Sequence, residues 1–150
     1  MRCLVRRVSH AQVRVAEHKV GEIKRGLLLF LGVAQADEEA DLRWLLKKVL
    51  GIRLFPDEEG RMNEPLGDED GILVISQFTL FGTLRKGFRP SFNRAAEPEK
   101  ARSLYEQFVY SLKKECKGPV SSGEFGGDMQ IDAVDEGPVT IWLDSAQKDY

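Results

Sequence analysis

The stretch that decides the fold is Leu27-Leu28-Leu29-Phe30-Leu31-Gly32-Val33, a continuous run of apolar residues. A run of this kind is typical of a central β-strand that is covered on both faces. The uncharged stretch around it, residues 26–36, is much shorter than the roughly 20 apolar residues that a transmembrane helix needs. We therefore expect a buried strand at the centre of a sheet.

Further strand patterns lie on both sides of this run. Residues 72–75 repeat its buried pattern, and Ala11, Val13 and Val15 alternate with other residues in the period of a half-buried strand. The other predicted strands cover residues 2–8, 19–23, 51–55, 129–133 and 139–143, with polar turns at 56–70 and 136–138.

Two amphipathic helices are predicted. The first begins at Asp37, interpreted as its N-cap, has four apolar residues on one face and ends at Gly51. The second opens at Glu97-Pro98 and ends by Gly118-Pro119. Two helices cannot cover both faces of so much sheet, so sheet must pack on sheet. We expect an α/β fold with three layers, β/β/α, in which both helices lie on one outer side.

The composition is that of an ordinary globular protein: 150 residues, 42% hydrophobic and 31% charged. This length suits a single domain over residues 1–150. The first nine residues contain arginines with no apolar block behind them, so no secretory signal is predicted. The two cysteines, Cys3 and Cys116, are too few for a disulfide scaffold, which favours a reduced, cytoplasmic protein.

The charge distribution is uneven although the net charge is only −2. That small charge argues against a general DNA-coating protein or a polybasic membrane binder. However, residues 1–16 and 71–96 contain arginines or lysines and no acid. A local basic surface suits one phosphate-bearing end better than a long duplex, and ordinary solvated arginines are the alternative interpretation.

No standard catalytic or cofactor motif is present in the sequence. His10 and His18 have no third ligand at a metal spacing, and neither cysteine stands in a motif that activates a thiolate. A Gly-x-Ser-x-Gly elbow, a Walker loop and a Gly-x-Gly-x-x-Gly motif are all missing. We therefore predict no metal and no cofactor.

Polar residues at the end of a predicted strand are the remaining candidates. Ser76-Gln77-Phe78-Thr79 follows the buried strand, and backbone N–H groups leaving a strand end can form an oxyanion hole. The following residues 85–92 interleave charges with aromatics, which fits a nucleotide end but also fits a packed basic loop. Gly137-Pro138 is either a simple turn or a cis peptide bond.

Taken together, three segments resemble the signature segments of the D-aminoacyl-tRNA deacylases. They are residues 76–80 (Ser-Gln-Phe-Thr-Leu), 86–92 (Lys-Gly-Phe-Arg-Pro-Ser-Phe) and 137–140 (Gly-Pro-Val-Thr). Weaker matches at residues 7–8, 60–63 and 128–130 extend the resemblance over nearly the whole chain. Residues 146–150 carry no part of it and are expected to form a tail.

The resemblance implies a homodimer that hydrolyses the ester between a D-amino acid and the 3′-terminal adenosine of tRNA, and that also acts on some glycyl-tRNAs. It implies that the tRNA 2′-hydroxyl assists water, so that neither a metal nor a cofactor is required. The implied partner is aminoacyl-tRNA, with no role for DNA or a membrane.

The resemblance also implies roles for particular residues. Ser76, Gln77, Phe78 and Thr79 would line the pocket for the adenosine and the scissile ester. Gly137 and Pro138, joined by a cis peptide bond, would enter the active site of the other subunit and exclude L side chains. The residue that would fix this loop is Arg7. The basic segment would add substrate contacts from Lys86, Arg89 and Pro90.

One residue departs from the family pattern. The family usually has Asn two residues before the glycine of Gly-Pro, and this chain has Asp135, which as a carboxylate accepts hydrogen bonds but cannot donate them. Three other functions stay open. Thr79 could be a covalent nucleophile, the protein could bind RNA 3′ ends without catalysis, or it could be an interaction module that uses its sheet edges.

Overall fold

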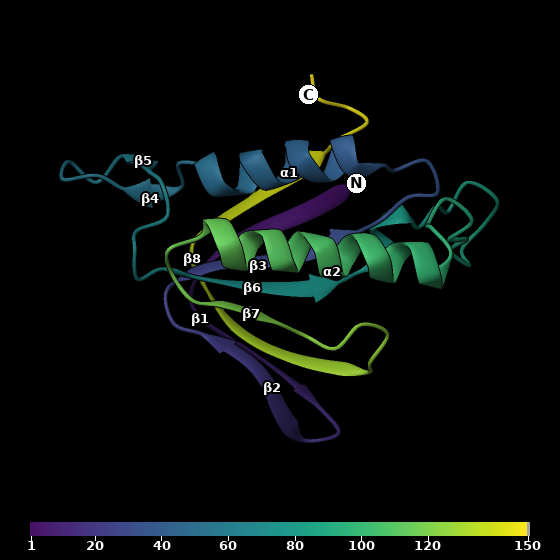
Figure 1. Ribbon diagram of the computed structural model, residues 1–150, viewed down its shortest axis with the longest axis horizontal. Helices are drawn as coiled ribbons and strands as arrows, with labels where there is room; N and C mark the ends of the chain where they lie inside the picture. The colour runs from purple at the N-terminus through teal and green to yellow at the C-terminus, as the bar shows by residue number, and fades with distance from the viewer. Residues whose placement is uncertain (150) are drawn as a thin grey trace.

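The computed structural model describes residues 1–149, and its chain order is shown in Figure 1. The elements that build the main sheet and its helices are β1 (Arg2–Val15), β2 (His18–Ile23), β3 (Gly26–Gly32), α1 (Glu39–Gly51), β6 (Gly71–Ser76), α2 (Pro98–Glu115), β7 (Val120–Ser122) and β8 (Met129–Asp144). The smaller elements are β4 (Phe55–Pro56), β5 (Met62–Glu64) and the 3₁₀ helix η1 (Phe78–Phe81). No helix among residues 1–149 is long and apolar enough to cross a membrane.

The main sheet is mixed, with strand order β2-β1-β3-β6-β7. The long strand β1 pairs antiparallel with β3 through its first half, with β2 through its second half, and with β8 along most of its length. The buried strands β3 and β6 run parallel, with Leu31 opposite Ser76, and β6 pairs in parallel with β7. The two apolar runs of the sequence form buried strands, as predicted, and the structure makes them neighbours at the centre of the sheet.

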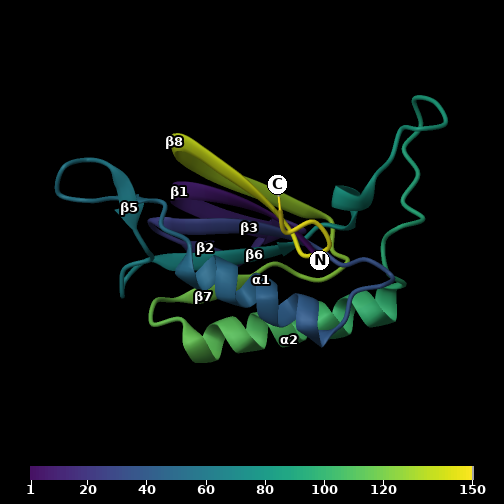
Figure 2. The ribbon, with the colours of Figure 1, turned by 90° about the horizontal axis from the view of Figure 1, so that it is seen from above.

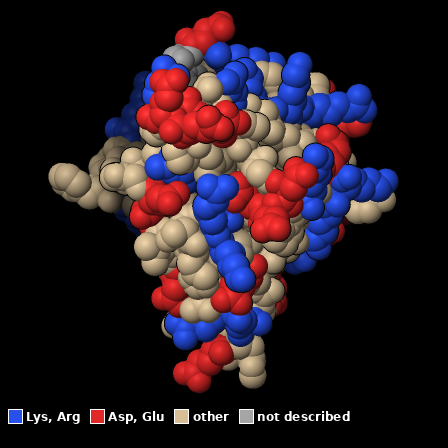
Figure 3. Space-filling view, turned by 90° about the vertical axis from the view of Figure 1, so that its left-hand side faces the viewer, with Lys and Arg blue, Asp and Glu red and all other residues tan. Residues whose placement is uncertain are grey.

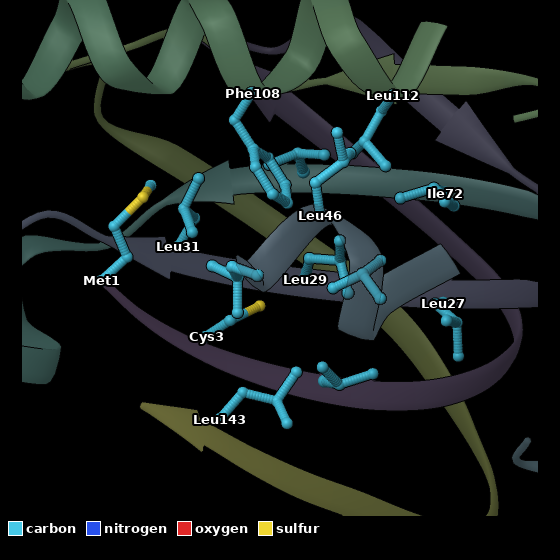
Figure 4. Close-up of a cluster of buried hydrophobic side chains, with 14 of the residues drawn as sticks. Met1, Cys3, Leu27, Leu29, Leu31, Leu46, Ile72, Phe108, Leu112 and Leu143 are labelled. Atoms are coloured by element: carbon cyan, nitrogen blue, oxygen red, sulfur yellow. The ribbon is translucent and has the colours of Figure 1, made fainter. Parts of the chain in front are cut away.

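The first apolar core lies between the sheet and the helices. Side chains such as Leu29 from β3, Leu46 from α1 and Phe108 from α2 meet in it (Figure 4). Cys3 is fully buried here, and burial raises the pKa of its thiol, so this cysteine is a structural residue. Figure 2 shows both helices on the same side of the sheet, as the sequence predicts.

A second apolar core lies inside the sheet, which bends so that its two parts face each other. Val13 from β1 and Ile23 from β2 pack with Leu28, Leu73 and Ile75 from the central strands. Gly21 in β2 permits this approach, because a Cβ atom there would stand 2.9 Å from the carbonyl oxygen of Ser122. The predicted packing of sheet on sheet, with helices on one outer side, is confirmed.

Several predicted boundaries are wrong, each for a local reason. Asp37 is not the N-cap of α1, because its carboxylate binds the amino group of Met1 and the backbone N–H of Ala34; Glu38 caps the helix instead. Only Phe55 of the predicted strand 51–55 is paired, and it pairs with β5 inside the stretch expected to be turns.

The C-terminal half also differs from the prediction in two places. The two strands predicted at 129–133 and 139–143 form one strand, β8, with an irregular register around Gly137. The strand β7 was not predicted, because its three half-buried residues, Val-Ser-Ser, are too few to show a period. This short strand completes the edge of the sheet beside β6.

Candidate active site

The carboxyl end of β6 carries the polar segment that the sequence singles out. The N–H of Gln77 donates to the carbonyl of Leu31 (2.8 Å), which holds this segment against the end of β3. The chain then turns into η1, where the N–H of Gly82 donates to the carbonyl of Thr79 (2.9 Å). The side-chain amide of Gln77 also donates to the hydroxyl of Thr79. Backbone contacts therefore fix the segment, and Ser76 and Gln77 are half-buried.

A cavity of about 1190 Å³ opens beside this strand end. Ser76, Gln77 and Phe78 line it, whereas Thr79 is exposed outside the lining. Its apolar walls come from α2, from the β7–β8 loop and from the start of β8. The lining residues from these three segments are Pro98, Ala101, Tyr105, Phe125, Gly126, Gly127, Met129 and Ile131. Polar and charged side chains, among them Gln35, Asn93 and Glu97, also line it. A largely apolar cavity with a few polar groups is the usual form of a small-molecule site.

Tyr105 forms part of this wall through its ring. Its hydroxyl donates to the carbonyl of Val74 (2.9 Å), and its ring lies 5.6 Å from the ring of Phe125. Burial raises the pKa of Tyr105 to about 12, so the phenol stays neutral at physiological pH. Tyr105 therefore adds no charge to its part of the cavity wall.

A hairpin projects beyond η1 and borders the cavity. The hairpin, defined as residues 83–91, is closed by two hydrogen bonds between the backbones of Thr83 and Ser91, both 2.9 Å long. Arg89 and Pro90 line the cavity, whereas Lys86 is exposed and does not. At the base of the hairpin the ring of Phe92 packs edge-on against the ring of Phe78 at 5.0 Å. The basic segment and the Ser-Gln-Phe-Thr segment are thus brought together.

Gly137 and Pro138 lie in an irregular part of β8, and their peptide bond is cis, as the resemblance implies. Both residues are exposed. The guanidinium of Arg7, which is largely buried, donates to the carbonyls of Glu136 (3.1 Å) and Leu54. The side chain of Arg7 thus contacts the backbone just before Gly137.

Asp135, the departure from the family pattern, has a specific partner in this chain. Its two carboxylate oxygens accept hydrogen bonds from Nε and one terminal nitrogen of Arg6, at 2.9 and 2.8 Å. A planar guanidinium and a carboxylate match in such a paired contact. The carboxylate therefore has the donor that it needs, and the backbone ahead of Gly137 is tied to β1.

Within one chain the Gly-Pro turn and the cavity lie far apart. Arg7, opposite the turn, pairs with Leu27 at the start of β3, whereas Ser76 pairs with Leu31 near its end. The turn is thus separated from Ser76 by four residues along β3 and by the three spacings between β8, β1, β3 and β6. At ordinary strand dimensions this distance is on the order of 20 Å. The structure therefore does not bring Arg7, Gly137 and Pro138 to the cavity of the same chain.

Sequence reasoning missed the apolar side of the cavity. Neither Tyr105, which lies within the second predicted helix, nor the loop of residues 123–127 is among the site residues predicted from the sequence. The available signal in that loop was one phenylalanine among three glycines. Phe125, Gly126 and Gly127 all line the cavity.

Comparisons with known proteins agree over the full length. The family model described as D-Tyr-tRNA(Tyr) deacylase matches residues 4–144. A D-aminoacyl-tRNA deacylase of Chloroherpeton thalassium is 49% identical, with 99% of each chain covered. One of Thermotoga petrophila is 52% identical, with 98% of this chain and 99% of the other covered.

A solved structure agrees with the fold as well. The structure titled c-Myc DNA Unwinding Element Binding Protein superposes with a TM-score of 0.88 at 34% identity, and covers 96% of this chain and 98% of that one. The sequence segments, the bent sheet with its two helices and these matches lead to one conclusion: the chain belongs to the D-Tyr-tRNA(Tyr) deacylase family.

Proposed function

We propose that this protein hydrolyses the ester of D-aminoacyl-tRNA to release the amino acid and the tRNA, and spares L-aminoacyl-tRNA. The observation that carries the proposal is the cavity at the end of β6, whose lining includes the polar residues Ser76 and Gln77. Full-length similarity to proteins named D-aminoacyl-tRNA deacylase supports the same reaction.

The chemistry requires positioning more than a strong side-chain nucleophile, because an aminoacyl ester is already reactive. We place the terminal adenosine against the apolar wall of the cavity and the ester at Ser76–Thr79. Backbone N–H groups of that segment would stabilise the oxyanion of the tetrahedral intermediate. The 2′-hydroxyl of the tRNA would assist the attacking water, and no metal or cofactor takes part. We therefore expect activity to survive exhaustive chelation; loss on chelation with rescue by zinc would contradict this.

The chiral filter is assigned to Gly137 and Pro138 of a second copy of the chain. The turn is exposed and on the order of 20 Å from Ser76 of its own chain, so it can serve an active site only in a homodimer. Its two carbonyl oxygens would accept hydrogen bonds from the amino group of the substrate. The side chain of an L-amino acid would collide with them, whereas glycine has no side chain to exclude. Some glycyl-tRNAs would therefore also be hydrolysed.

Cations of the hairpin would bind the phosphates near the 3′ end. Arg89 borders the cavity, and Arg85 and Lys86 are exposed beyond it. Removing such contacts weakens binding and flattens its dependence on salt. An unchanged salt dependence in a folded variant with alanine at all three positions would mean that the hairpin cations do not contact the tRNA.

The decisive test compares matched D- and L-aminoacyl-tRNAs with purified protein and measures the loss of ester. The dimer arrangement is tested with a mixed dimer in which one chain has an altered Gly137 and the other an altered Ser76 and Gln77. Its only intact pocket then receives the Gly-Pro turn of the other chain. Retained selectivity supports the exchange between subunits, whereas lost selectivity shows that each turn serves its own chain.

A protein that binds RNA 3′ ends without catalysis is distinguished by the same assay. It would bind charged tRNA and leave the lifetime of the ester unchanged. An interaction module would show no salt-dependent binding of tRNA at all. Thr79 as a covalent nucleophile would leave an acyl group on that residue, which mass spectrometry of quenched reactions detects.

A further inference from the structure

The hairpin of residues 83–91 presents an aromatic ring with no packing role. Phe88 is fully exposed, at 101% of its reference surface, and Leu84 in the same hairpin is 61% exposed. Figure 2 shows the segment between η1 and α2 extending away from the sheets and helices. A large apolar side chain at the tip of such a projection contributes nothing to the core, so its presence points to a ligand.

The hairpin is an ordered projection. The paired hydrogen bonds of Thr83 and Ser91 close its base, and the N–H of Gly87 donates to the carbonyl of Leu84 (3.1 Å) at its tip. Gly87 has a φ of 126°, a conformation that suits glycine and permits the tight turn just before Phe88. The ring of Phe88 is therefore held out on a defined support.

The charges around Phe88 indicate what kind of ligand it meets. Arg85, Lys86 and Arg89 flank the ring, and the sequence contains no acid from residue 71 to residue 96. At the opposite end of the molecule, basic and acidic side chains are interspersed over the surface (Figure 3). Aromatic rings surrounded by cations are the usual means of binding single-stranded nucleic acid, because the ring stacks on a base and the cations bind phosphates.

We propose that Phe88 stacks on an unpaired base of the tRNA 3′ end, upstream of the terminal adenosine in the cavity. This inference rests on the proposed function. Pro90 lines the cavity, and two residues of extended chain span at most about 7 Å. The ring of Phe88 therefore stands within reach of the nucleotides that directly precede the terminal one. The hairpin acts as a second contact that guides the single strand into the cavity.

The experiment measures binding of uncharged RNA oligonucleotides of increasing length that share one 3′ end, so it does not depend on catalysis. In the wild-type protein, the nucleotides before the terminal adenosine increase the affinity. Phe88→Ala is expected to remove roughly 5- to 100-fold of that increase, which corresponds to stacking of one base. Binding of adenosine monophosphate alone is expected to be unchanged, because the cavity is intact.

Two variants sharpen the measurement. Phe88→Trp keeps a stacking surface and is expected to retain the affinity, whereas Phe88→Leu keeps only apolar area and is expected to lose most of it. Tyr110→Ala is the matched control, because Tyr110 is 60% exposed on α2 and lies outside both the cavity lining and the hairpin.

The proposal is overturned if Phe88→Ala binds the longer oligonucleotides as the wild type does. It is also overturned if the variant weakens adenosine monophosphate equally, which indicates a distorted cavity. A changed sedimentation coefficient with unchanged RNA affinity assigns Phe88 to contact between copies of the chain. If the wild-type protein binds the oligonucleotides but hydrolyses no D-aminoacyl ester, the proposed function fails while stacking stands.

Discussion

The two ends of the central sheet are held in opposite ways. At the carboxyl end of β6, Ser76 and Gln77 are held by backbone hydrogen bonds and bordered by the aromatic wall around Tyr105. At the other end, the turn that contains Gly137 and Pro138 is exposed, and two arginines of β1 tie down the residues before it. Burial and backbone hydrogen bonds thus stabilise the end that contains Ser76 and Gln77, called the pocket end. Charged side chains stabilise the end that contains Gly137 and Pro138, called the turn end.

This difference follows from what each end must do under the proposed function. A pocket that surrounds its substrate can use the sheet itself for support, because strands and core lie directly behind it. A turn that enters another subunit must project, so little core lies behind it. Charged groups that reach out from the neighbouring strand then supply the rigidity that burial cannot. Residues at one end can therefore be changed while the other end stays unaltered.

The largest effect is expected from Gly137→Ala. Gly137 has a φ of 126°, and a Cβ atom there would stand 2.8 Å from a side-chain carbon of Val139. The methyl group would also enter the space that the proposed function gives to the substrate. We expect kcat/KM for D-aminoacyl-tRNA to fall at least 100-fold, or about 3 kcal/mol of transition-state stabilisation.

Gly60→Ala is the matched control for backbone strain. Gly60 also has a positive φ, of 77°, but nothing lies within 4 Å of a Cβ atom there. This variant is expected to lose stability and keep its activity. Equal kinetic constants for Gly137→Ala and the wild type would remove Gly137 from the active site of any subunit.

A smaller effect is expected from the ion pair at the turn end. Asp135→Asn or Arg6→Gln alone breaks the paired hydrogen bonds, whereas the double variant replaces the ion pair with two amides that can bind each other. Both groups are partly exposed, so we expect a coupling free energy of about 1 kcal/mol between Arg6 and Asp135. It would be measured as a several-fold change in the ratio of kcat/KM for D-aminoacyl-tRNA to that for L-aminoacyl-tRNA. The coupling should weaken at high salt.

The control for this double-mutant cycle is the affinity for uncharged 3′-end oligonucleotides, which depends on the pocket end. If Asp135 acts only through the turn, the variants change selectivity and leave binding of uncharged 3′-end oligonucleotides constant. Additive effects of the two single changes on the D-to-L ratio would mean that Arg6 and Asp135 act independently. The departure from the family Asn would then have no partner-based explanation.

Thr79→Ala is expected to have a modest effect, less than about tenfold in kcat, because backbone N–H groups survive truncation of a side chain. The structure agrees with a minor role for this hydroxyl, since Thr79 lies outside the cavity lining and accepts a hydrogen bond from Gln77. Single-turnover kinetics measures the effect. Complete loss of activity in a folded Thr79→Ala protein would instead favour the covalent mechanism.

The sequence predicted the pocket end better than the turn end, and the reason is physical. Continuous apolar runs such as residues 27–33 and 72–75 indicate central strands. Polar residues that directly follow such a strand are then expected at an end of the sheet. The turn end depends on pairing between β1 and β8, which are more than 100 residues apart in the sequence. No local pattern indicates which acid Arg6 will bind.

The apolar wall of the cavity could not be predicted from the sequence for a related reason. Tyr105 and Phe125 belong to different segments and become neighbours only when α2 packs beside β6 and β7. Similarly, Asp37 has the residue type and position of an N-cap, but the amino group of Met1 competes for its carboxylate. At Asp37, an ion pair with a residue distant in the sequence therefore overrides the local preference for an N-cap.

The smallest effect is expected from Tyr105→Phe, which tests the aromatic wall of the pocket end. The change removes one buried hydrogen bond to Val74, whose carbonyl still accepts from the N–H of Gly123 (2.9 Å). We expect a loss of about 1 kcal/mol in the free energy of unfolding at pH 7, measured with urea.

The pH dependence of this loss has a definite sign. Burial raises the pKa of Tyr105 to about 12, whereas an unfolded tyrosine has a pKa of about 10. The stabilisation that Tyr105 provides is therefore complete below pH 10 and is lost as the pH rises towards 12. The difference between wild type and Tyr105→Phe should shrink by about 1 kcal/mol between pH 9 and pH 11. A constant difference across this range would mean that the phenol is not buried, and the pocket end would then not be held by burial alone.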